Sequence, residues 1–404
     1  MKCFKVLQLK KIFKLSIFFL ILTLLLVLSK QNYECVKLSV NLFITSIMPS
    51  LFPFILFTEI ILKTDILDIV SRIFGKMFSK LFNVSKNSSL AIIIGFICGF
   101  PMGAKAINEL YKKGKITYND AVKLLSFVNN CSPAFILSTI GVGIFFNIKI
   151  GVILLISQIL SAIIIGVIHS KKYLPNTTPN DMNSLYNLDK KTANIITVNK
   201  EQTNLKKSNN QKFQNSFFKI LKESILGSFK TLCNILGFII IFNLAYNIIS
   251  IFLLNIHLNN KVIKLLSPIF EVTKGSYDIH SLNLALNAKI ILISIMLGFS
   301  GLCINFQIFS CLTDIPYKFK TLVKNKTIHG ILSGITTYIL LKLNFIQEAT
   351  NTVFSNNDYT LQATSTYYIE NIRKSYLVST FAIICMLIIY YILYKYKIHN
   401  KYKI

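Results

Sequence analysis

The chain has 404 residues, of which 53% are hydrophobic and only 15% are charged. Soluble globular domains have about 25% charged residues, so the composition excludes an ordinary soluble domain and favours a polytopic membrane protein. Lysine and arginine outnumber aspartate and glutamate by 44 to 16. These basic residues lie between apolar segments, as juxtamembrane residues do. We expect no nucleic-acid partner, because no basic stripe with interleaved aromatic residues occurs on a soluble module.

The cysteines and histidines form no pattern of a metal or cofactor site. Five of the eight cysteines lie inside apolar runs, and no Cys-x-x-Cys occurs. We interpret them as small hydrophobic side chains in packed helices. The five histidines are isolated and lack metal-ligand spacing. We therefore predict no metal ligand and no cofactor.

Apolar runs long enough to cross a bilayer, which takes about 20 residues, recur along the chain. Residues 1–37 combine basic residues with an apolar run and predict an uncleaved signal-anchor helix, because no small-x-small cleavage pattern follows. A shorter run at 327–341 is a weaker candidate span. Six further candidate spans carry at most one charge: 38–62, 124–148, 150–170, 231–254, 290–312 and 375–394. We predict an all-α polytopic membrane protein with about eight transmembrane helices.

Residues 88–106 differ from these runs, because Gly95, Gly99, Pro101 and Gly103 fall within nine residues. In a helix interior, proline costs about 3 kcal/mol and glycine about 1 kcal/mol, so a continuous helix is disfavoured. Irregular backbone at membrane depth is tolerated only inside protein or beside a cavity. Lysines flank the segment on both sides and prefer the cytoplasmic face. We predict a broken, re-entrant helical hairpin that returns both flanks to that face.

The remaining segments divide the chain into two halves. Residues 65–82 predict an amphipathic helix in the membrane interface. The predicted domains are 38–170 for a first repeat, 171–223 for a polar cytoplasmic linker with ten lysines and four acids, 224–343 for a second repeat, 344–375 for a polar loop, and 376–404 for a C-terminal helix with a basic tail.

The two halves share a short string. Residues 82–86, Phe-Asn-Val-Ser-Lys, resemble residues 270–274, Phe-Glu-Val-Thr-Lys, and a glycine-interrupted apolar segment follows each. Breaks at matching positions indicate a transporter binding site at a repeat interface. Two alternatives remain for 289–312. A second hairpin gives an inverted repeat, whereas a full span places the later basic segments inside, as the charge rule prefers.

Polar residues next to the first break are candidates for solute binding. Lys105 follows the hairpin, where a half-helix N-terminus would help it to bind an anion; alternatively it extends to the interface. Asn129, Asn130 and Ser132 interrupt the next apolar run. Pro133 frees a backbone carbonyl four residues back, which we expect to be that of Asn129. Coordination of a solute or ion is favoured over interhelical hydrogen bonding alone.

Two other residues suggest chemistry that we disfavour. Glu59 could relay protons, but its spacing from Lys63 favours an ion pair. Ser300 lies in a Gly-x-Ser-Gly string like that of rhomboid-type intramembrane serine proteases, for which His329 could be the base. Because His329 lies at the edge of a candidate span, we predict no catalytic residue and no enzyme.

Two longer strings resemble a known family. GFPMGAKAINELYKKGKIT at 99–117, followed by LLSFVNNCSPAFILSTIGVGIF at 124–145, resembles the sporulation integral membrane proteins of the YlbJ family. FEVTKGS and GFSGLCINFQIFS in the second half are similar to that family's second repeat. This chain departs from the family in having Met102 after Pro101, and Cys131 and Ser132 before Pro133.

The resemblance implies two nucleoside-recognition, or gate, domains whose helical hairpins meet at the membrane centre. It implies a multi-pass membrane protein of the outer forespore membrane that moves dipicolinic acid, a small dianion, out of the mother cell. Partners would be this anion and the bilayer, with a homo-oligomer left open. On this interpretation the substrate-binding residues are Gly99, Pro101, Gly103, Lys105, Asn129, Asn130, Ser132, Ser300, Gly301 and Gln307.

Other functions stay open beside this one. A nucleoside or cation carrier of the gate-domain type is one alternative, although no Asp/Glu pair for sodium stands out at the hairpins. A scaffold for forespore membrane assembly, with hairpins that have lost transport, is another. An intramembrane serine protease is the least favoured.

Overall fold

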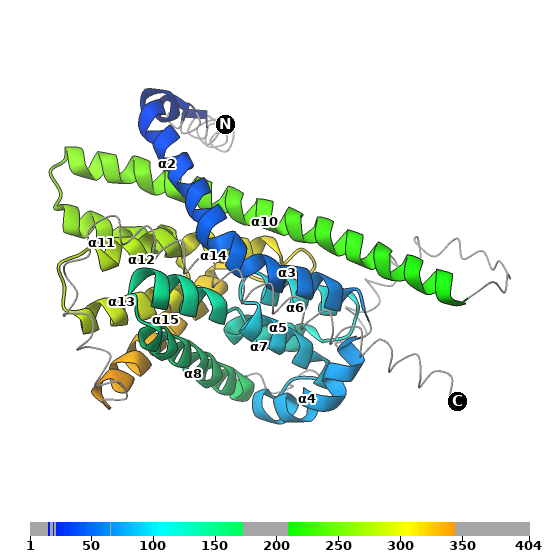
Figure 1. The fold of residues 1–404 in the computed structure, drawn as a ribbon. Helices are drawn as coiled ribbons and strands as arrows, with labels where there is room; N and C mark the ends of the chain where they lie inside the picture. Colours follow the sequence, from blue (N-terminus) through cyan, green and yellow to red (C-terminus); the bar gives the residue numbers. More distant parts are fainter. Residues whose placement is uncertain (1–14, 17–18, 20–21, 65, 173–208, 344–404) are drawn as a thin grey trace, which may run out of the picture.

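A computed structural model describes residues 15–16, 19, 22–64, 66–172 and 209–343, with side chains described from 218 onward in the last range. Within these ranges the chain is helical and forms no strand (Figure 1). The predicted all-α class is therefore confirmed. The predicted C-terminal span 375–394 and loop 344–375 lie outside the described residues, as does about half of the predicted signal-anchor segment 1–37.

The first half contains one long bent helix, an amphipathic helix, a hairpin, a broken helix and a long straight helix. These elements are α2 (Ser29–Leu42), η1 (Phe43–Ile47), α3 (Met48–Leu62), α4 (Ile66–Phe82), η2 (Lys86–Ser88), α5 (Ser89–Ile97), α6 (Met102–Lys112), α7 (Tyr118–Phe127), η3 (Phe135–Ile144) and α8 (Ile148–Lys172).

The second half begins with a very long helix and continues with a hairpin, a broken helix and another long helix. These elements are α10 (Asn209–Asn255), α11 (Asn260–Phe270), α12 (Val272–His280), α13 (Leu286–Phe299), α14 (Gly301–Ser310) and α15 (Phe319–Lys342). Since α10 begins at Asn209, the last part of the predicted linker 171–223 is helical. The domain boundaries stay a prediction.

Four helical stretches of the described chain are long and apolar enough to cross a membrane: Ser29–Leu62, Ile148–Lys171, Phe218–Asn255 and Leu286–Ser310. They contain four of the predicted spans almost completely. The predicted run 124–148 is instead two helices, α7 and η3, with non-helical backbone between them, because Pro133 and the polar residues before it interrupt the hydrogen-bond ladder. The described residues therefore do not establish a count of eight spans.

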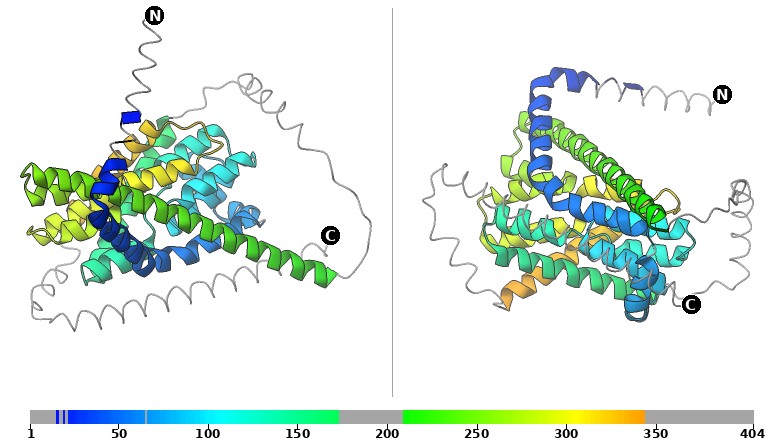
Figure 2. Two further views of the ribbon diagram at one scale, coloured as in Figure 1. Left: turned by 90° about the horizontal axis from the view of Figure 1, so that it is seen from above. Right: turned by 45° about the vertical axis from the view of Figure 1, so that its right-hand side comes forward.

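These stretches form an outer and an inner layer. In the most apolar part of the α10 stretch only 22% of residues are buried, and in Ser29–Leu62 only 33%, against 67% for Leu286–Ser310. Figure 2 shows α10 lying along the outside of the molecule and crossed by α2. Exposed apolar side chains on α10, such as Ile241 and Phe252, suit contact with lipid. The hairpins and broken helices form the inner layer.

A helical hairpin occurs at the predicted place, because α5 and α6 pack against each other and are joined by residues 98–101; that it is re-entrant stays a prediction. Its two arms cross closely, since a Cβ on Gly103 would lie 3.1 Å from the Cα of Gly95. The turn uses Gly99 at φ +76°, a backbone conformation that costs glycine little. The glycines that weaken a continuous helix thus permit the tight hairpin.

The second hairpin lies elsewhere than predicted. It consists of α11 and α12, which pack together and turn at Glu271, so a hairpin at 289–312 is wrong. That segment forms α13 and α14, in one stretch broken at Ser300 and Gly301, both with left-handed backbone. The span alternative describes it better. The string at 82–86 precedes the first hairpin, whereas the similar string at 270–274 forms the tip of the second, so the two do not mark equivalent positions.

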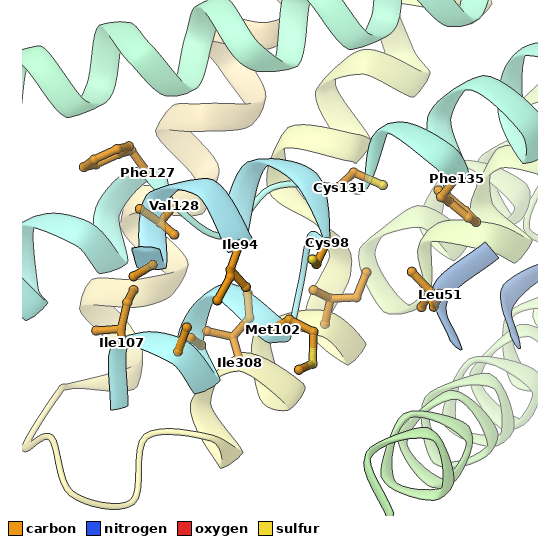
Figure 3. Close-up of a cluster of buried hydrophobic side chains, with 14 of the residues drawn as sticks. Leu51, Ile94, Cys98, Met102, Ile107, Phe127, Val128, Cys131, Phe135 and Ile308 are labelled. Atoms are coloured by element: carbon orange, nitrogen blue, oxygen red, sulfur yellow. The ribbon is translucent and has the colours of Figure 1, made fainter. Parts of the chain in front are cut away.

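The order of hairpin, broken helix and long helix occurs once in each half. Buried apolar side chains of both halves pack together around the first hairpin, where Ile308 of α14 joins Ile94, Met102 and Ile107 (Figure 3). Polar contacts also cross between the halves, for Gln158 of α8 donates to the Ser333 hydroxyl of α15 at 2.6 Å.

The predicted amphipathic helix at 65–82 appears as α4. Ile73, Phe74 and Met77 are exposed beside the basic residues Arg72 and Lys76. A helix whose free surface is apolar and basic suits a position in the membrane interface.

Candidate functional site

The tip of the first hairpin contacts the break between α7 and η3. The Phe100 amide donates to the Asn130 carbonyl at 2.9 Å. A Cβ on Gly99 would lie 2.6 Å from the Ser132 nitrogen, so only glycine allows this approach. The broken segment is locally held by Ser132, whose hydroxyl accepts from the Phe135 amide at 3.3 Å.

The tip of the second hairpin contacts the break between α13 and α14 in a similar way. A Cβ on Gly301 would lie 3.1 Å from the Pro268 carbonyl oxygen and 3.3 Å from that of Phe270. Ser300 is fully buried and donates to the Leu297 carbonyl at 3.1 Å. The Asn305 amide donates to the Gly301 carbonyl at 2.6 Å. At both breaks, some of the backbone groups that lack a helical partner therefore form hydrogen bonds with nearby side chains or with a hairpin tip.

A small cavity lies where these elements meet. Its volume is about 30 Å³, which is room for about one water molecule. Both hairpin tips, both broken helices, α10 and the η1–α3 bend contribute to its wall. The lining residues are Ile47, Leu51, Phe100, Cys131, Ser132, Phe135, Ile235, Ile239, Glu271, Val272, Thr273, Ile304 and Gln307.

Glu271 is the carboxylate of this cavity and is only 3% exposed. One carboxylate oxygen accepts from the Thr273 amide at 2.9 Å and the other from the Lys274 amide at 2.7 Å. It thus caps the N-terminus of α12, where a negative charge is favoured. Sequence reasoning named Glu271 only within a shared string and overlooked its role. The sequence did offer one indication of a helix cap: an acidic residue, Glu271, three residues after Pro268 and just before the segment that forms α12.

Lys105 lies away from the cavity lining. It pairs with Glu59 of α3 and lies 3.3 Å from the Thr231 hydroxyl of α10. Glu59 also lies 3.8 Å from Lys63, so the predicted Glu59–Lys63 pair is confirmed. The positive charge of Lys105 is balanced by Glu59 in this structure. Its role as a substrate ligand stays a prediction.

The carbonyl expected to be freed by Pro133 is indeed that of Asn129, and it accepts a hydrogen bond from Lys326 Nζ on α15. Asn129 is 2% exposed, and neither side-chain polar atom has a partner within the described residues. The Asn130 side chain donates to the Phe127 carbonyl at 3.0 Å. Lys326 is 2% exposed and was missed, because its neighbours in sequence suggest the edge of a span.

The structure brings most of the predicted site residues together around the two breaks. Ser132 and Gln307 line the cavity. Gly103 contacts the Asn129 side chain, since a Cβ there would lie 3.0 Å from Asn129 Oδ1. Pro101 is buried at the start of α6 and follows a cis peptide bond.

The protease alternative gains no support from this arrangement. Ser300 donates to backbone carbonyls of α13, while the His329 ring contacts the Gln158 carbonyl at 3.3 Å. Across the part of the chain that the structure describes, no three His, Cys, Asp or Glu residues cluster as metal ligands.

Comparison with known proteins agrees with this class of architecture. The family model described as "Gate: Nucleoside recognition" matches residues 44–151, which run from the η1–α3 bend through the first hairpin and broken helix to the start of α8. The fold and this match indicate an integral membrane protein in which residues 44–151 are similar to gate-type domains.

The chain is also similar to a particular protein, the "Sporulation integral membrane protein YlbJ" of Bacillus subtilis (strain 168). The two are 24% identical over 410 aligned residues, which cover 95% of this chain and 96% of that protein. No solved structure matches this chain. The resemblance inferred from the two sequence strings is therefore confirmed.

Proposed function

We propose that this chain moves a small polar solute across a membrane during sporulation. The observation that carries the proposal is the meeting of two hairpin tips and two broken helices around one buried cavity. Irregular backbone at such depth is stable only where it is buried in protein or lines a solute path. The gate-type match and the sporulation protein similar over nearly the whole chain support this function.

The cavity is too small for an organic solute, so transport requires movement of the hairpins. Its volume of about 30 Å³ is far below the several hundred Å³ of ordinary ligand pockets. At each tip the hairpin contacts a break: Phe100 donates to the Asn130 carbonyl, and Gly301 lies against the tip of the second hairpin. Separation of a tip from its break would widen the cavity and open it to one side.

The candidate cargo is dipicolinate, carried from the mother cell across the outer forespore membrane. Dipicolinate is a planar dianion at neutral pH and needs N–H donors or cations in a low-dielectric site, where each interaction is stronger than in water. The buried side-chain amide of Asn129, beside the first break, and that of Gln307, in the cavity wall, are such donors.

The test compares spores of a strain lacking this gene with spores of the parent and of a strain complemented with the wild-type gene. We expect low dipicolinate in the mutant spores, with dipicolinate still made in the mother cells. Complementation should restore the spore content. Normal spore content in the deletion strain would contradict the dipicolinate proposal.

A nucleoside carrier is the second candidate, favoured by the description of the matching family model. It predicts uptake of radiolabelled uridine into vesicles that contain the purified chain, while dipicolinate stays outside. If such vesicles move neither solute nor a cation, the scaffold alternative gains weight.

A further inference from the structure

A buried lysine that makes no ion pair with any described residue lies beside the first helix break. Lys326 of α15 is 2% exposed, and its ammonium group donates to the Asn129 carbonyl. The ion pairs recorded among described residues join Lys63 and Lys105 to Glu59, and Lys274 to Asp278; none includes Lys326. A buried charge without an opposite charge is costly. A carboxylate beside Lys326 would remove much of that cost.

The acidic groups of the inner layer have other partners. Glu271 accepts from two backbone amides at the N-terminus of α12. Glu59 is engaged by two lysines. The titratable groups facing Lys326 are Cys131 from the broken segment and His329 from its own helix, neither of which is a carboxylate.

Unused hydrogen-bonding groups lie at the same place. The side-chain nitrogen and oxygen of Asn129 both lack a hydrogen-bond partner among the described residues, although the residue is only 2% exposed. Buried amides are normally satisfied. The Asn129 NH2 group is thus an available donor next to the ammonium group that holds the backbone of the same residue.

The unwound segment connects this charge to the cavity. Asn129 contacts Lys326, and Cys131 and Ser132, two and three residues later, line the cavity wall. The carbonyl that Lys326 contacts is therefore two residues along the backbone from the first lining residue of this segment. Because Lys326 is 2% exposed, bulk water screens a charge on its side chain only weakly.

We infer that Lys326 selects an anionic cargo at this centre, by binding a solute carboxylate together with the Asn129 amide when the hairpin tip moves away. The inference rests on the proposed transport function and goes further by assigning the specificity charge to α15 in the second half. It makes Lys326, and not Lys105, the main determinant of preference for an anion.

The test measures calorimetric binding to the full-length protein in detergent, with pyridine-2,6-dicarboxylate and its uncharged diamide as probes. Lys326→Gln keeps a donor for the Asn129 carbonyl but removes the charge. Lys326→Arg keeps both. Lys342→Gln is the matched control, because it removes the same charge from an exposed position at the end of the same helix.

We expect the wild type to bind the dicarboxylate more tightly than the diamide. Lys326→Gln should weaken dicarboxylate binding about tenfold or more, leave diamide binding unchanged, and not lower the melting temperature. Lys326→Arg and Lys342→Gln should retain the preference. Equal affinity of the wild type for the two probes, or binding to neither, would overturn the inference even if Lys326→Gln fails to fold.

An unchanged dicarboxylate affinity in folded Lys326→Gln would also overturn it and show that Lys326 only satisfies the Asn129 carbonyl. This failure is distinct from failure of the proposed function, which the dipicolinate content of deletion-strain spores decides. Low spore dipicolinate together with unchanged binding by Lys326→Gln would remove this inference alone.

Discussion

For single residues, the residue type at a few positions determines where the helices break. Pro133 removes one helical hydrogen bond, and the carbonyl that it frees on Asn129 is satisfied by a lysine 197 residues away in sequence. The break could be foreseen from the proline and its polar neighbours. The partner could not, because nothing local to Lys326 distinguishes it from other basic residues near a span.

Gly95 provides a test of the close contact between the first hairpin and the broken segment. A Cβ at Gly95 would lie 2.2 Å from the Val128 carbonyl oxygen, so Gly95→Ala must push α5 away from the break. We expect a loss of about 1–3 kcal/mol, as for other overpacked sites, and a lower melting temperature in detergent.

Gly237→Ala is the matched control, because Gly237 lies in a helix and a Cβ there would meet nothing within 4 Å. It should leave the melting temperature unchanged or raise it, since alanine is the better helix former by about 1 kcal/mol. Equal melting temperatures for the two variants would show that Gly95 does not make the tight contact described here.

At the scale of elements, the hairpins differ in how they are made. The first turns on glycine and proline, which are visible in the sequence. The second turns on Glu271, whose extended backbone and capping side chain end α11 and begin α12. Its two arms, α11 and α12, are short and contain many polar residues. The longer apolar segment 289–312, with its glycines, therefore resembled a membrane hairpin more closely.

The cap predicts the behaviour of the second hairpin when Glu271 is changed. Glu271→Ala removes both acceptors and should cost about 0.5–2 kcal/mol, as loss of an N-cap does. Glu271→Gln keeps one acceptor and should cost less. Hydrogen exchange measured by mass spectrometry should be faster across the start of α12 in Glu271→Ala than in Glu271→Gln or the wild type.

Asn259→Ala is the control for this experiment. Asn259 caps α11 by accepting from the Lys261 amide at 2.9 Å, and it is exposed. Its loss should accelerate exchange at the start of α11 and leave α12 protected. Unchanged exchange at α12 in Glu271→Ala would contradict the capping role.

At the scale of the whole molecule, the halves are joined through inner helices and through a surface contact. Asn108 in the second half of α6 donates to the Asp314 carboxylate at 2.8 Å and accepts from the Asp314 amide at 3.1 Å. Asp314 lies between α14 and α15, outside the membrane-spanning stretches. Hydrogen bonds from Thr313 and Asn108 hold the pKa of its carboxyl below the usual range.

This lowered pKa gives the contact a defined pH dependence. Because the folded protein favours the ionised carboxylate, the contribution is present above the unfolded-state pKa of about 4 and is lost as pH falls through the lower folded-state pKa. The melting temperature of the wild type should exceed that of Asp314→Asn at neutral pH, and the difference should vanish in acid.

Asn108→Ala removes the hydrogen-bond donor that the first half contributes. In that background, Asp314→Asn should lower the melting temperature at neutral pH by less than it does in the wild type. Solvent screens an exposed contact of this kind, so the shift should be small. A difference between wild type and Asp314→Asn that grows in acid would contradict the assignment.

The sequence is sufficient to assign the class of the molecule, because apolar runs of span length, basic flanks and breaks at glycine and proline are local properties. It determined the first hairpin, the broken segment after it and the freed carbonyl of Asn129 for the same reason. Tertiary packing brings Glu59 to Lys105, Lys326 to the break, and Glu271 to the wall of a cavity with Ser132 and Gln307. These contacts join residues far apart in the chain, and no local pattern in the sequence identifies their partners.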